Sequence, residues 1–293
     1  MEALMISIAL CTYNGEKHLH EQMESLLKQD YPNLELVILD DCSTDRTYEL
    51  LLQYQEKHPK IRLAQNKENL GFNKNFETAL LQCKGAFIAI ADQDDIWEPD
   101  KVSKLAAQIG NNLLIYHDSL LIDVDGHTSG RKTSNTHRFV KGHCASYLLY
   151  NNCVSGHTCL MSKAFLPHLL PFPEGIYYDW WMAYTAACLG KIDYLDLALV
   201  KHRRHASSST SKDKISGKAL RIKNLSLFQT HPLNTEPTKT LIKEVLDGYA
   251  VLKQQPFSKA LFWTLLKNLK SIFYTRRKSL FSQIKFILKE STR

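Results

Sequence analysis

The first part of the chain alternates between short apolar runs and segments with helical spacing. Four runs have the length and composition of buried strands: Ile6–Leu10, Leu34–Leu39, Ile61–Ala64 and Phe87–Ala91. Between them, apolar residues recur every three or four positions, as on one face of a helix. This alternation predicts an α/β fold in which a largely parallel sheet carries helices on both faces.

The pattern changes beyond the fourth run, where strand-like pieces no longer alternate regularly with helices. The piece Leu120–Val124 runs into Asp125-Gly126, which predicts a hairpin turn. A helix is predicted from about Asp179 to Leu189, where a glycine ends it, and a strand follows at Ile192–Leu195. We therefore expect one mixed α/β domain over residues 1–206.

Residues 207–293 have a helical pattern and a different charge. The whole chain carries a net charge of +7, and from Pro256 to Arg293 there are nine Lys or Arg and one acid, Glu290, a net charge of +8. The remaining 255 residues therefore sum to about −1. We predict a neutral α/β domain followed by a helical region that is basic and amphipathic from about residue 256.

The composition of the chain is that of an ordinary globular protein: 293 residues, 44% hydrophobic and 23% charged. The chain has no run of the roughly eighteen apolar residues that a membrane span needs, and no basic segment precedes an apolar core at its start. Its seven cysteines contain no CxxC pair, which favours reduced, buried thiols. These features predict a cytoplasmic protein.

A cluster of carboxylates follows the fourth apolar run at once: Asp92, Asp94 and Asp95, with Gln93 between them. Ligands of parallel sheets bind at the C-terminal ends of strands, and carboxylates this close repel one another unless a cation joins them. A divalent cation held by carboxylate oxygens, with other positions open to water and a diphosphate, explains the cluster. The alternative is a solvated acidic turn that caps a helix beginning near Pro99.

Polar residues also follow the other predicted strands. In chain order they are Thr12, Tyr13 and Asn14, then Asp40 and Asp41, then Asn69, Gly71 and Asn75. Because the ends of parallel strands meet at one edge of a sheet, we expect these residues to share a pocket with the carboxylate cluster. Neither GxGxxG nor GxxxxGK is present, so a bound nucleotide diphosphate would need a metal to neutralise its charge.

The order of these motifs resembles that of a family 2 glycosyltransferase of the GT-A type. The resemblance covers about residues 4–206 and rests on Ile8–Gly15, Leu39–Asp45, Asn69–Gly71 and Asp92–Trp97. It implies a Rossmann-like mixed sheet, a nucleotide-sugar donor, Mg²⁺ or Mn²⁺, and inversion at the anomeric carbon. The segments around Asp92 and Asp179 resemble the rhamnosyltransferase-like branch that makes bacterial polysaccharides and lipopolysaccharides. This suggests dTDP-L-rhamnose as donor, with UDP-hexoses left open.

The resemblance also assigns the donor site. It implies that Asp41 and the segment after the first strand hold the nucleotide base, whereas Asp92 and Asp94 face the ribose and the metal. His202–His205 is similar to a basic segment that contacts the diphosphate, and Ser207–Ser211 is expected to close as a lid; the alternative is a solvated basic turn. The implied donor site is Thr12, Tyr13, Asn14, Asp41, Asn69, Gly71, Asn75, Asp92, Gln93, Arg204 and His205, with Asp92 and Asp94 as metal ligands.

The catalytic base of the family is a carboxylate at the start of a later helix, and Asp179 matches it. Tyr178 replaces the first acid of the family's usual Glu-Asp pair. Such a base removes the proton of the acceptor hydroxyl during attack. The alternative is a helix cap. The acceptor side is expected to include Asp95, Trp97, Asn152, Gly156, Trp180 and Trp181, although large aromatic residues at helical spacing are often core residues.

The basic C-terminal segment interleaves its cations with aromatic residues between Lys259 and Lys289. This pattern is typical of a helix that lies on an anionic membrane. Because acceptors of the family are often lipid-linked glycans, we expect contact with the inner face of the cell membrane and not with nucleic acid. The alternative is a packed helical bundle.

Together these features predict a metal-dependent inverting glycosyltransferase that acts on a glycan or lipid-linked acceptor in bacterial surface polysaccharide synthesis. Two other classes stay open. A sugar-nucleotide nucleotidyltransferase also binds magnesium through carboxylates but usually has a glycine-rich loop with Lys or Arg after the first strand. A non-catalytic nucleotide-sugar binding protein would not need Asp92, Asp94 and Asp179.

Overall fold

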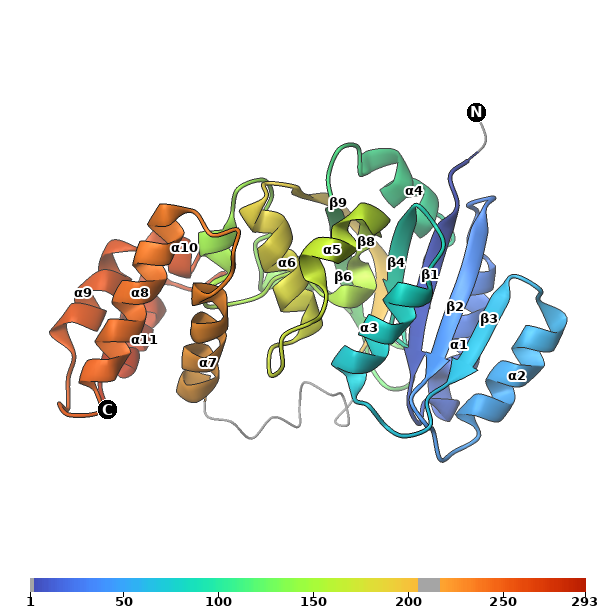
Figure 1. The fold of residues 1–293 in the computed structure, drawn as a ribbon, viewed down its shortest axis with the longest axis horizontal. Coiled ribbons are helices and arrows are strands. Elements are labelled where there is room, and N and C mark those ends of the chain that lie inside the picture. Colours follow the sequence, from blue (N-terminus) through green and yellow to red (C-terminus); the bar gives the residue numbers. More distant parts are fainter. Residues whose placement is uncertain (1–2, 205–216) are drawn as a thin grey trace.

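The computed structural model describes residues 3–204 and 217–293. Figure 1 shows a mixed sheet with helices on both faces, followed by a group of C-terminal helices. The strands are β1 Ile6–Thr12, β2 Leu34–Asp40, β3 Ile61–Gln65, β4 Phe87–Ala91, β5 Ile96–Trp97, β6 Leu114–Ile122, β7 Thr128–Lys132, β8 Leu160–Ser162 and β9 Ile192–Arg203. The predicted donor residue His205 and the predicted lid Ser207–Ser211 lie outside the described residues.

The helices alternate with strands in the first part of the chain and dominate its end. They are α1 Glu16–Leu27, α2 Thr47–Lys57, α3 Phe72–Gln82, α4 Lys101–Gln108, α5 Leu166–Leu169, α6 Tyr178–Cys188, α7 Gly217–Gln229, α8 Glu236–Val251, α9 Lys259–Lys267, α10 Leu269–Ile272 and α11 Leu280–Ser291. Short 3-10 turns include Thr133–Asn135, Ala145–Leu148 and Gly156–Thr158.

The strand order is β3-β2-β1-β4-β8-β6-β9-β5, and β7 pairs with β6. Strands β1 to β4 are parallel, whereas β8 runs antiparallel to β4 and β6. Side chains alternate between the faces: Ile8 and Leu10 of β1 join the core beneath α1 and α4, whereas Ala9 and Cys11 join the core beneath α3. Burial on both faces explains the continuous apolar runs, and the predicted α/β fold is confirmed.

Two predicted strands are longer than their sequence pattern indicated. The predicted piece Leu120–Val124 overlaps the end of a longer strand, β6, which begins at Leu114 and turns at Gly126 (φ +86°) into β7, so the predicted hairpin exists. Strand β9 continues to Arg203, so His202 and Arg203 belong to the sheet and not to a segment after it. Pairing with β6 extends β9 past Leu195, the end predicted from the sequence, to Arg203.

The C-terminal helices pack onto the α/β part of the molecule. Leu261, Leu265 and Ile287 are fully buried, in the same apolar cluster as Trp180 and Phe228. The structure therefore shows the packed helical bundle for this region. In the described part of the chain, no helix is both long enough and apolar enough to cross a membrane. The domain boundary near residue 206 stays a prediction, because the two parts share this core.

Candidate active site

The ends of β1 and β4 are joined by Gln93. The backbone N–H of Tyr13 donates to Gln93 Oε1 at 2.8 Å, and Gln93 Nε2 donates to the Tyr13 carbonyl at 3.0 Å. A Cβ at Gly15 would displace the Gln93 amide, so the glycine leaves room for this pair of hydrogen bonds. The side chain of Tyr13 is 46% exposed, so its ring is available to a ligand at the sheet edge.

The carboxylate of Asp41, at the end of β2, accepts hydrogen bonds from other residues of the protein. Its carboxylate accepts hydrogen bonds from the N–H groups of Leu70 and Gly71, both at 2.9 Å, and from Asn66 Nδ2 at 2.8 Å. It is only 2% exposed. Asp41 thus shapes the loop that begins α3, and its predicted contact with a nucleotide base stays a prediction.

Other predicted donor residues form the frame of the same edge. Thr12 Oγ1 donates to Asp40 Oδ1, and Asn75 Nδ2 donates to the Leu39 carbonyl. Asn69 Nδ2 donates to the carbonyl of Asp41 at 3.4 Å. Asn14 has φ +48°, and its amide oxygen accepts from the N–H of Thr44. The structure brings these residues together, with Tyr13 as the large exposed side chain among them.

Asp92 and Asp94 lie at the end of β4 and both retain solvent access. The Asp92 side chain is 37% exposed, and its Oδ2 lies 3.4 Å from Nδ1 of His157. The backbone carbonyls of Asp92 and Asp94 accept from Gln22 Nε2 and Arg203 Nε, which fixes the turn that carries them. Accessible carboxylate oxygens are the ligands that Mg²⁺ and Mn²⁺ prefer, so these residues fit the predicted cation.

Asp95 has a different environment and has no exposed surface. Burial alone raises its pKa, but the charge of His157 and the hydrogen bond from His202 lower it to about 2. Asp95 Oδ1 also accepts from the Arg203 N–H at 3.1 Å. Trp97, 3% exposed, is similarly enclosed, with Lys101 Nζ 3.0 Å from its ring centroid. Contrary to the acceptor-side prediction, neither side chain is accessible to an acceptor.

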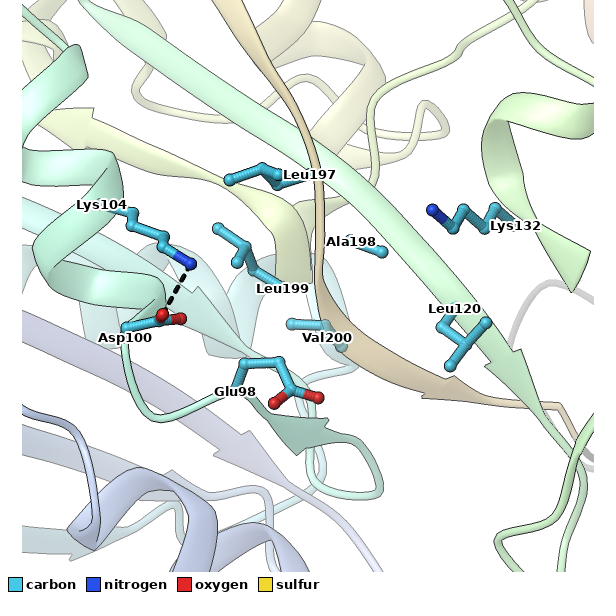
Figure 2. A pocket seen from close by; sticks show the side chains of 9 residues that line it. All are labelled: Glu98, Asp100, Lys104, Leu120, Lys132, Leu197, Ala198, Leu199 and Val200. Atoms are coloured by element: carbon cyan, nitrogen blue, oxygen red, sulfur yellow. Dashed lines mark ion pairs between the residues drawn. The ribbon is translucent and has the colours of Figure 1, made fainter. Parts of the chain in front are cut away.

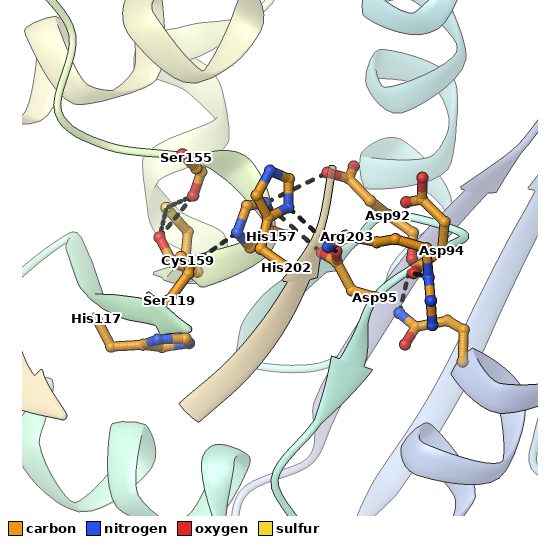
Figure 3. Close-up of polar contacts among 12 residues, drawn as sticks. Asp92, Asp94, Asp95, His117, Ser119, Ser155, His157, Cys159, His202 and Arg203 are labelled. Carbon is orange, nitrogen blue, oxygen red and sulfur yellow. Dashed lines mark hydrogen bonds and ion pairs between the residues drawn. The ribbon is translucent and has the colours of Figure 1, made fainter. Parts of the chain in front are cut away.

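His157 was not found from the sequence, although it lies at the centre of this network (Figure 3). Its Nε2 is 3.0 Å from Ser119 Oγ, its carbonyl accepts from Lys101 Nζ at 2.6 Å, and its ring stacks on His202 with centroids 4.4 Å apart. Burial lowers the pKa of His202, but the hydrogen bond to Asp95 raises it overall. A single histidine after a glycine gives no periodic signal in the sequence.

Arg203 is a second residue whose structural role, holding the acidic turn in place, was not predicted from the sequence pattern. Its side chain is 1% exposed; NH2 bonds to Glu21 Oε2 at 2.6 Å, and NH1 bonds to the carbonyl of Val124 at 3.0 Å. Together with its bond to the Asp94 carbonyl, this guanidinium joins α1, the β6–β7 turn and the acidic turn. Arg203 therefore positions the Asp94 backbone from the interior, whereas Arg204 is exposed.

Asp179 lies in the first turn of α6, half-buried. Burial raises its pKa to about 7, and the charge of Asp92 also raises it. Hydrogen bonds from the N–H groups of Trp180 and Gly156 and from the Asn152 side chain act in the opposite direction by favouring the ionised form. The structure thus places Asp179 beside the acidic turn, with Asn152 and Gly156 around it.

Trp180 and Trp181 are core residues, each 9% exposed. The indole N–H of Trp180 donates to the Leu148 carbonyl at 2.6 Å, and that of Trp181 donates to the Leu169 carbonyl at 3.3 Å. Both rings pack against Phe228 of α7. Burial and used N–H groups leave little of either ring for stacking on a sugar, contrary to the acceptor-side prediction.

Residues 7–169 match the glycosyl transferase family 2. The chain belongs to this family. An uncharacterized family relative, a glycosyltransferase of Haemophilus influenzae, is 28% identical over 220 residues, which is 71% of this chain and 68% of that protein. The poly(ribitol-phosphate) beta-N-acetylglucosaminyltransferase TarS of Staphylococcus aureus is 35% identical over 126 residues, 42% of this chain but only 21% of TarS.

Two solved structures are similar in fold to this family 2 chain. Residues 1–349 of S. aureus TarS in complex with UDP-GlcNAc have a TM-score of 0.65 at 23% identity, covering 92% of this chain and 82% of that one. The mannosyltransferase PcManGT from Pyrobaculum calidifontis, in complex with GDP-Man and Mn²⁺, has a TM-score of 0.55 at 17% identity, covering 99% and 86%. These similarities establish the GT-A fold.

An open hollow of about 460 Å³ is lined by residues outside the acidic turn of this family 2 chain (Figure 2). It is lined by Leu120 and Lys132 of the β6–β7 hairpin, by Val200 of β9, and by the ion pair between Asp100 and Lys104. None of the predicted site residues lines it. The hollow is therefore a surface feature separate from the candidate active site.

Proposed function

We propose that the protein is a metal-dependent, inverting glycosyltransferase that transfers a sugar from a nucleotide-diphosphate donor to a glycan or lipid-linked acceptor in bacterial surface polysaccharide synthesis. One observation carries the proposal. Asp92 and Asp179, distant in the sequence, are linked by two adjacent residues: His157 Nδ1 lies 3.4 Å from Asp92 Oδ2, and the N–H of Gly156 donates to the Asp179 carboxylate. The charge of Asp92 also raises the pKa of Asp179. This proximity supports one site that contains both the proposed donor-binding carboxylate and the proposed base.

In this reaction Asp179 removes the proton of the acceptor hydroxyl while the hydroxyl oxygen attacks the anomeric carbon. A pKa of about 7 suits a base that works at neutral pH. The bond from the anomeric carbon to the diphosphate oxygen breaks on the opposite face, which inverts the configuration and releases the nucleoside diphosphate. Gly156 and Asn152 favour the ionised carboxylate by donating hydrogen bonds to it.

Mg²⁺ or Mn²⁺ bound to Asp92 and Asp94 would stabilise the charge on the departing diphosphate. The Mn²⁺ in the similar PcManGT complex supports a divalent cation here. For the donor, the UDP-GlcNAc complex of TarS supports a UDP-sugar, whereas the rhamnosyltransferase-like motifs favour dTDP-L-rhamnose. Tyr13, with its exposed ring, is the residue proposed to stack on the nucleotide base.

The test is Mn²⁺-dependent release of nucleoside diphosphate from UDP-GlcNAc, UDP-glucose, UDP-galactose and dTDP-L-rhamnose. We expect one donor to be hydrolysed or transferred by the wild-type protein and none by Asp179→Asn, which would still bind the donor. Donor binding without release by either protein contradicts catalysis. Pyrophosphate production from a nucleoside triphosphate and a sugar phosphate identifies a nucleotidyltransferase instead.

We also propose that the C-terminal helices rest on an anionic membrane, at the inner face of the cell membrane. Trp263 of α9 is 56% exposed and Phe281 of α11 is 78% exposed, in a region with many cations. Replacing both with serine should release the protein from phosphatidylglycerol vesicles. Leu52→Ser, an exposed apolar residue of α2, is the matched control. Equal vesicle binding by the double variant contradicts the membrane contact.

A further inference from the structure

Two segments far apart in the chain meet beside the acceptor side of the site, and neither contains an acid. The sequence has no Asp or Glu over Gly126–Pro173 or over Gly248–Lys289. Thr136–Arg138 lies antiparallel to Thr275–Arg277, where Arg138 N donates to the Thr275 carbonyl at 2.9 Å and Arg277 N donates to the Thr136 carbonyl at 3.1 Å. The fold therefore joins two acid-free segments into one surface.

The two segments and the residues next to their contact carry five cations that we call the basic strip: Arg138, Lys141, Arg276, Arg277 and Lys278. Arg276 is half-buried and the other four are exposed. The side-chain partners of the two central arginines are neutral. Arg276 Nε donates to Asn151 Oδ1 at 3.4 Å, and Arg277 Nε donates to the backbone carbonyls of Ser134 and His137. The fold thus orients both arginines, and no acid among residues 3–204 and 217–293 forms an ion pair with either of them.

Asp118 is a buried acid near this surface, and its carboxylate already accepts hydrogen bonds from neighbouring residues. It is 2% exposed, and its carboxylate accepts from the hydroxyl of Ser134 at 2.5 Å and from the N–H of Ser119 at 2.8 Å. Burial lowers the pKa of Arg276, and burial together with the charge of Arg276 lowers the pKa of His137. Uncompensated cations in partial burial favour an anionic ligand.

The basic strip is connected to the candidate base through two adjacent asparagines. Arg276 donates to the side chain of Asn151. The hydroxyl of Thr275 donates to the backbone carbonyl of Asn151 at 3.3 Å. The next residue, Asn152, donates from its side chain to the carboxylate of Asp179. The basic strip therefore lies close enough to Asp179 for one acceptor to contact both.

We propose that the basic strip is a subsite for a phosphate or phosphodiester group carried by the acceptor, an inference that rests on the proposed transferase function. Arg276 and Arg277 supply forked donors that match phosphate oxygens, and Arg138, Lys141 and Lys278 add charge. The phosphate group holds the acceptor at a point distant from the reacting hydroxyl. Its binding to the strip thereby orients that hydroxyl for attack.

The experiment measures binding of short-chain inorganic polyphosphate to the full-length protein by calorimetry, with EDTA present so that the carboxylate pair holds no cation. The variant Arg276→Gln/Lys278→Gln removes two charges from the strip. Its matched control, Lys239→Gln/Lys243→Gln, removes two charges from the exposed face of α8. Melting temperatures of all three proteins verify folding. Arg276→Lys tests whether charge alone restores binding.

We expect the strip variant to bind polyphosphate at least about tenfold more weakly, with a smaller salt dependence, because fewer phosphates are neutralised. The control should bind as the wild-type protein does, and Arg276→Lys should recover part of the loss. Equal affinity of the strip variant, or an equal loss in the control, overturns the proposal. So does a loss of phosphatidylglycerol vesicle binding with polyphosphate binding intact, which would make the strip a headgroup site.

Failure of this proposal can be separated from failure of the proposed function. Release of nucleoside diphosphate from a nucleotide-sugar needs Asp92, Asp94 and Asp179 but no phosphate on the acceptor. If the wild-type protein releases it and the strip does not bind polyphosphate, only the subsite is wrong. If polyphosphate binds at the strip but no nucleotide-sugar is consumed, the transferase function is wrong.

Discussion

The donor side and the acceptor side of the candidate site are built in different ways. On the proposed donor side, the loops that follow β1 to β4 are joined by hydrogen bonds, as between Gln93 and Tyr13 and between Asp41 and Gly71. On the acceptor side, Asn152 and Asp179 meet through packing of segments from the middle and the end of the chain. The donor side thus follows from sheet topology, whereas the acceptor side depends on the C-terminal helices.

This difference implies that changes in the two regions should affect different steps. The donor side should control binding of nucleotide and metal, and the acceptor side should control turnover once the donor is bound. The C-terminal helices belong with the acceptor side, because Tyr150 bonds to Tyr249 of α8 and Asn151 bonds to Thr275 and Arg276.

The largest expected effect is loss of the base. Asp179→Asn should lower kcat by roughly 10³-fold, within the usual range for a general base, while the donor Kd changes less than about twofold. The folded-state pKa of Asp179 is raised to about 7, so at pH values above the pKa of an unfolded Asp its ionised form destabilises the folded protein. Removing this carboxylate should therefore raise the melting temperature by a few degrees. Calorimetry and single-turnover kinetics measure both. Unchanged turnover would place the base elsewhere.

On the donor side, Asp94→Ala should abolish the part of nucleotide affinity that depends on metal, about 100-fold in Kd. Nucleotide affinity in EDTA should stay the same, because the contacts of Tyr13 and Gln93 remain. Titration of UDP with and without Mn²⁺ measures this difference. If Asp94→Ala weakens binding equally in both conditions, the residue supports the fold and does not hold a cation.

The pH dependence of turnover should be set by the ionisation of Asp179 on the proposed acceptor side. Because Asp179 acts as a base only when ionised and its pKa is about 7, kcat should rise about tenfold per pH unit below 7 and level off above it. Among the described residues, Asp92, Tyr178 and Cys159 are titratable groups that interact with it electrostatically. In Asp179→Asn this slope should disappear. A profile that is flat from about pH 5 to 9 contradicts the assignment.

The smallest expected effect on turnover comes from the C-terminal helices. Glu290 is fully buried, paired with Arg221 and bonded to the Tyr249 hydroxyl at 2.5 Å. Glu290→Gln should lower the free energy of unfolding by about 2 kcal/mol, because it leaves Arg221 without its partner. Turnover should fall a few-fold through Tyr150 with donor affinity unchanged. Chemical denaturation checks the first effect, and a change in donor affinity would contradict the second.

The sequence allowed more of the proposed donor side to be predicted than of the proposed acceptor side. The strand ends, the acidic turn and the position of Asp179 could be predicted, because each follows an apolar run or begins a periodic helix. Asp95 could not be separated from Asp92 and Asp94, since burial of one carboxylate depends on His157 and His202 from distant segments.

The C-terminal region shows the same limit. Interleaved cations and aromatic residues indicate an amphipathic helix but do not say whether its apolar face meets a membrane or the protein. The structure buries Leu261, Leu265 and Ile287, whereas it exposes Trp263 and Phe281. The meeting of Thr136–Arg138 with Thr275–Arg277 also has no local signature, because an antiparallel contact over this separation is decided by packing.

The most direct test of the central claim is a crystal structure of the protein with UDP and Mn²⁺. We predict that Mn²⁺ is ligated by carboxylates of Asp92 and Asp94, that the diphosphate lies at the end of β4, and that Asp179 faces the open side of the diphosphate. Binding of the nucleotide at another surface, or an Asp179 carboxylate turned away from the diphosphate, would contradict the proposed active site.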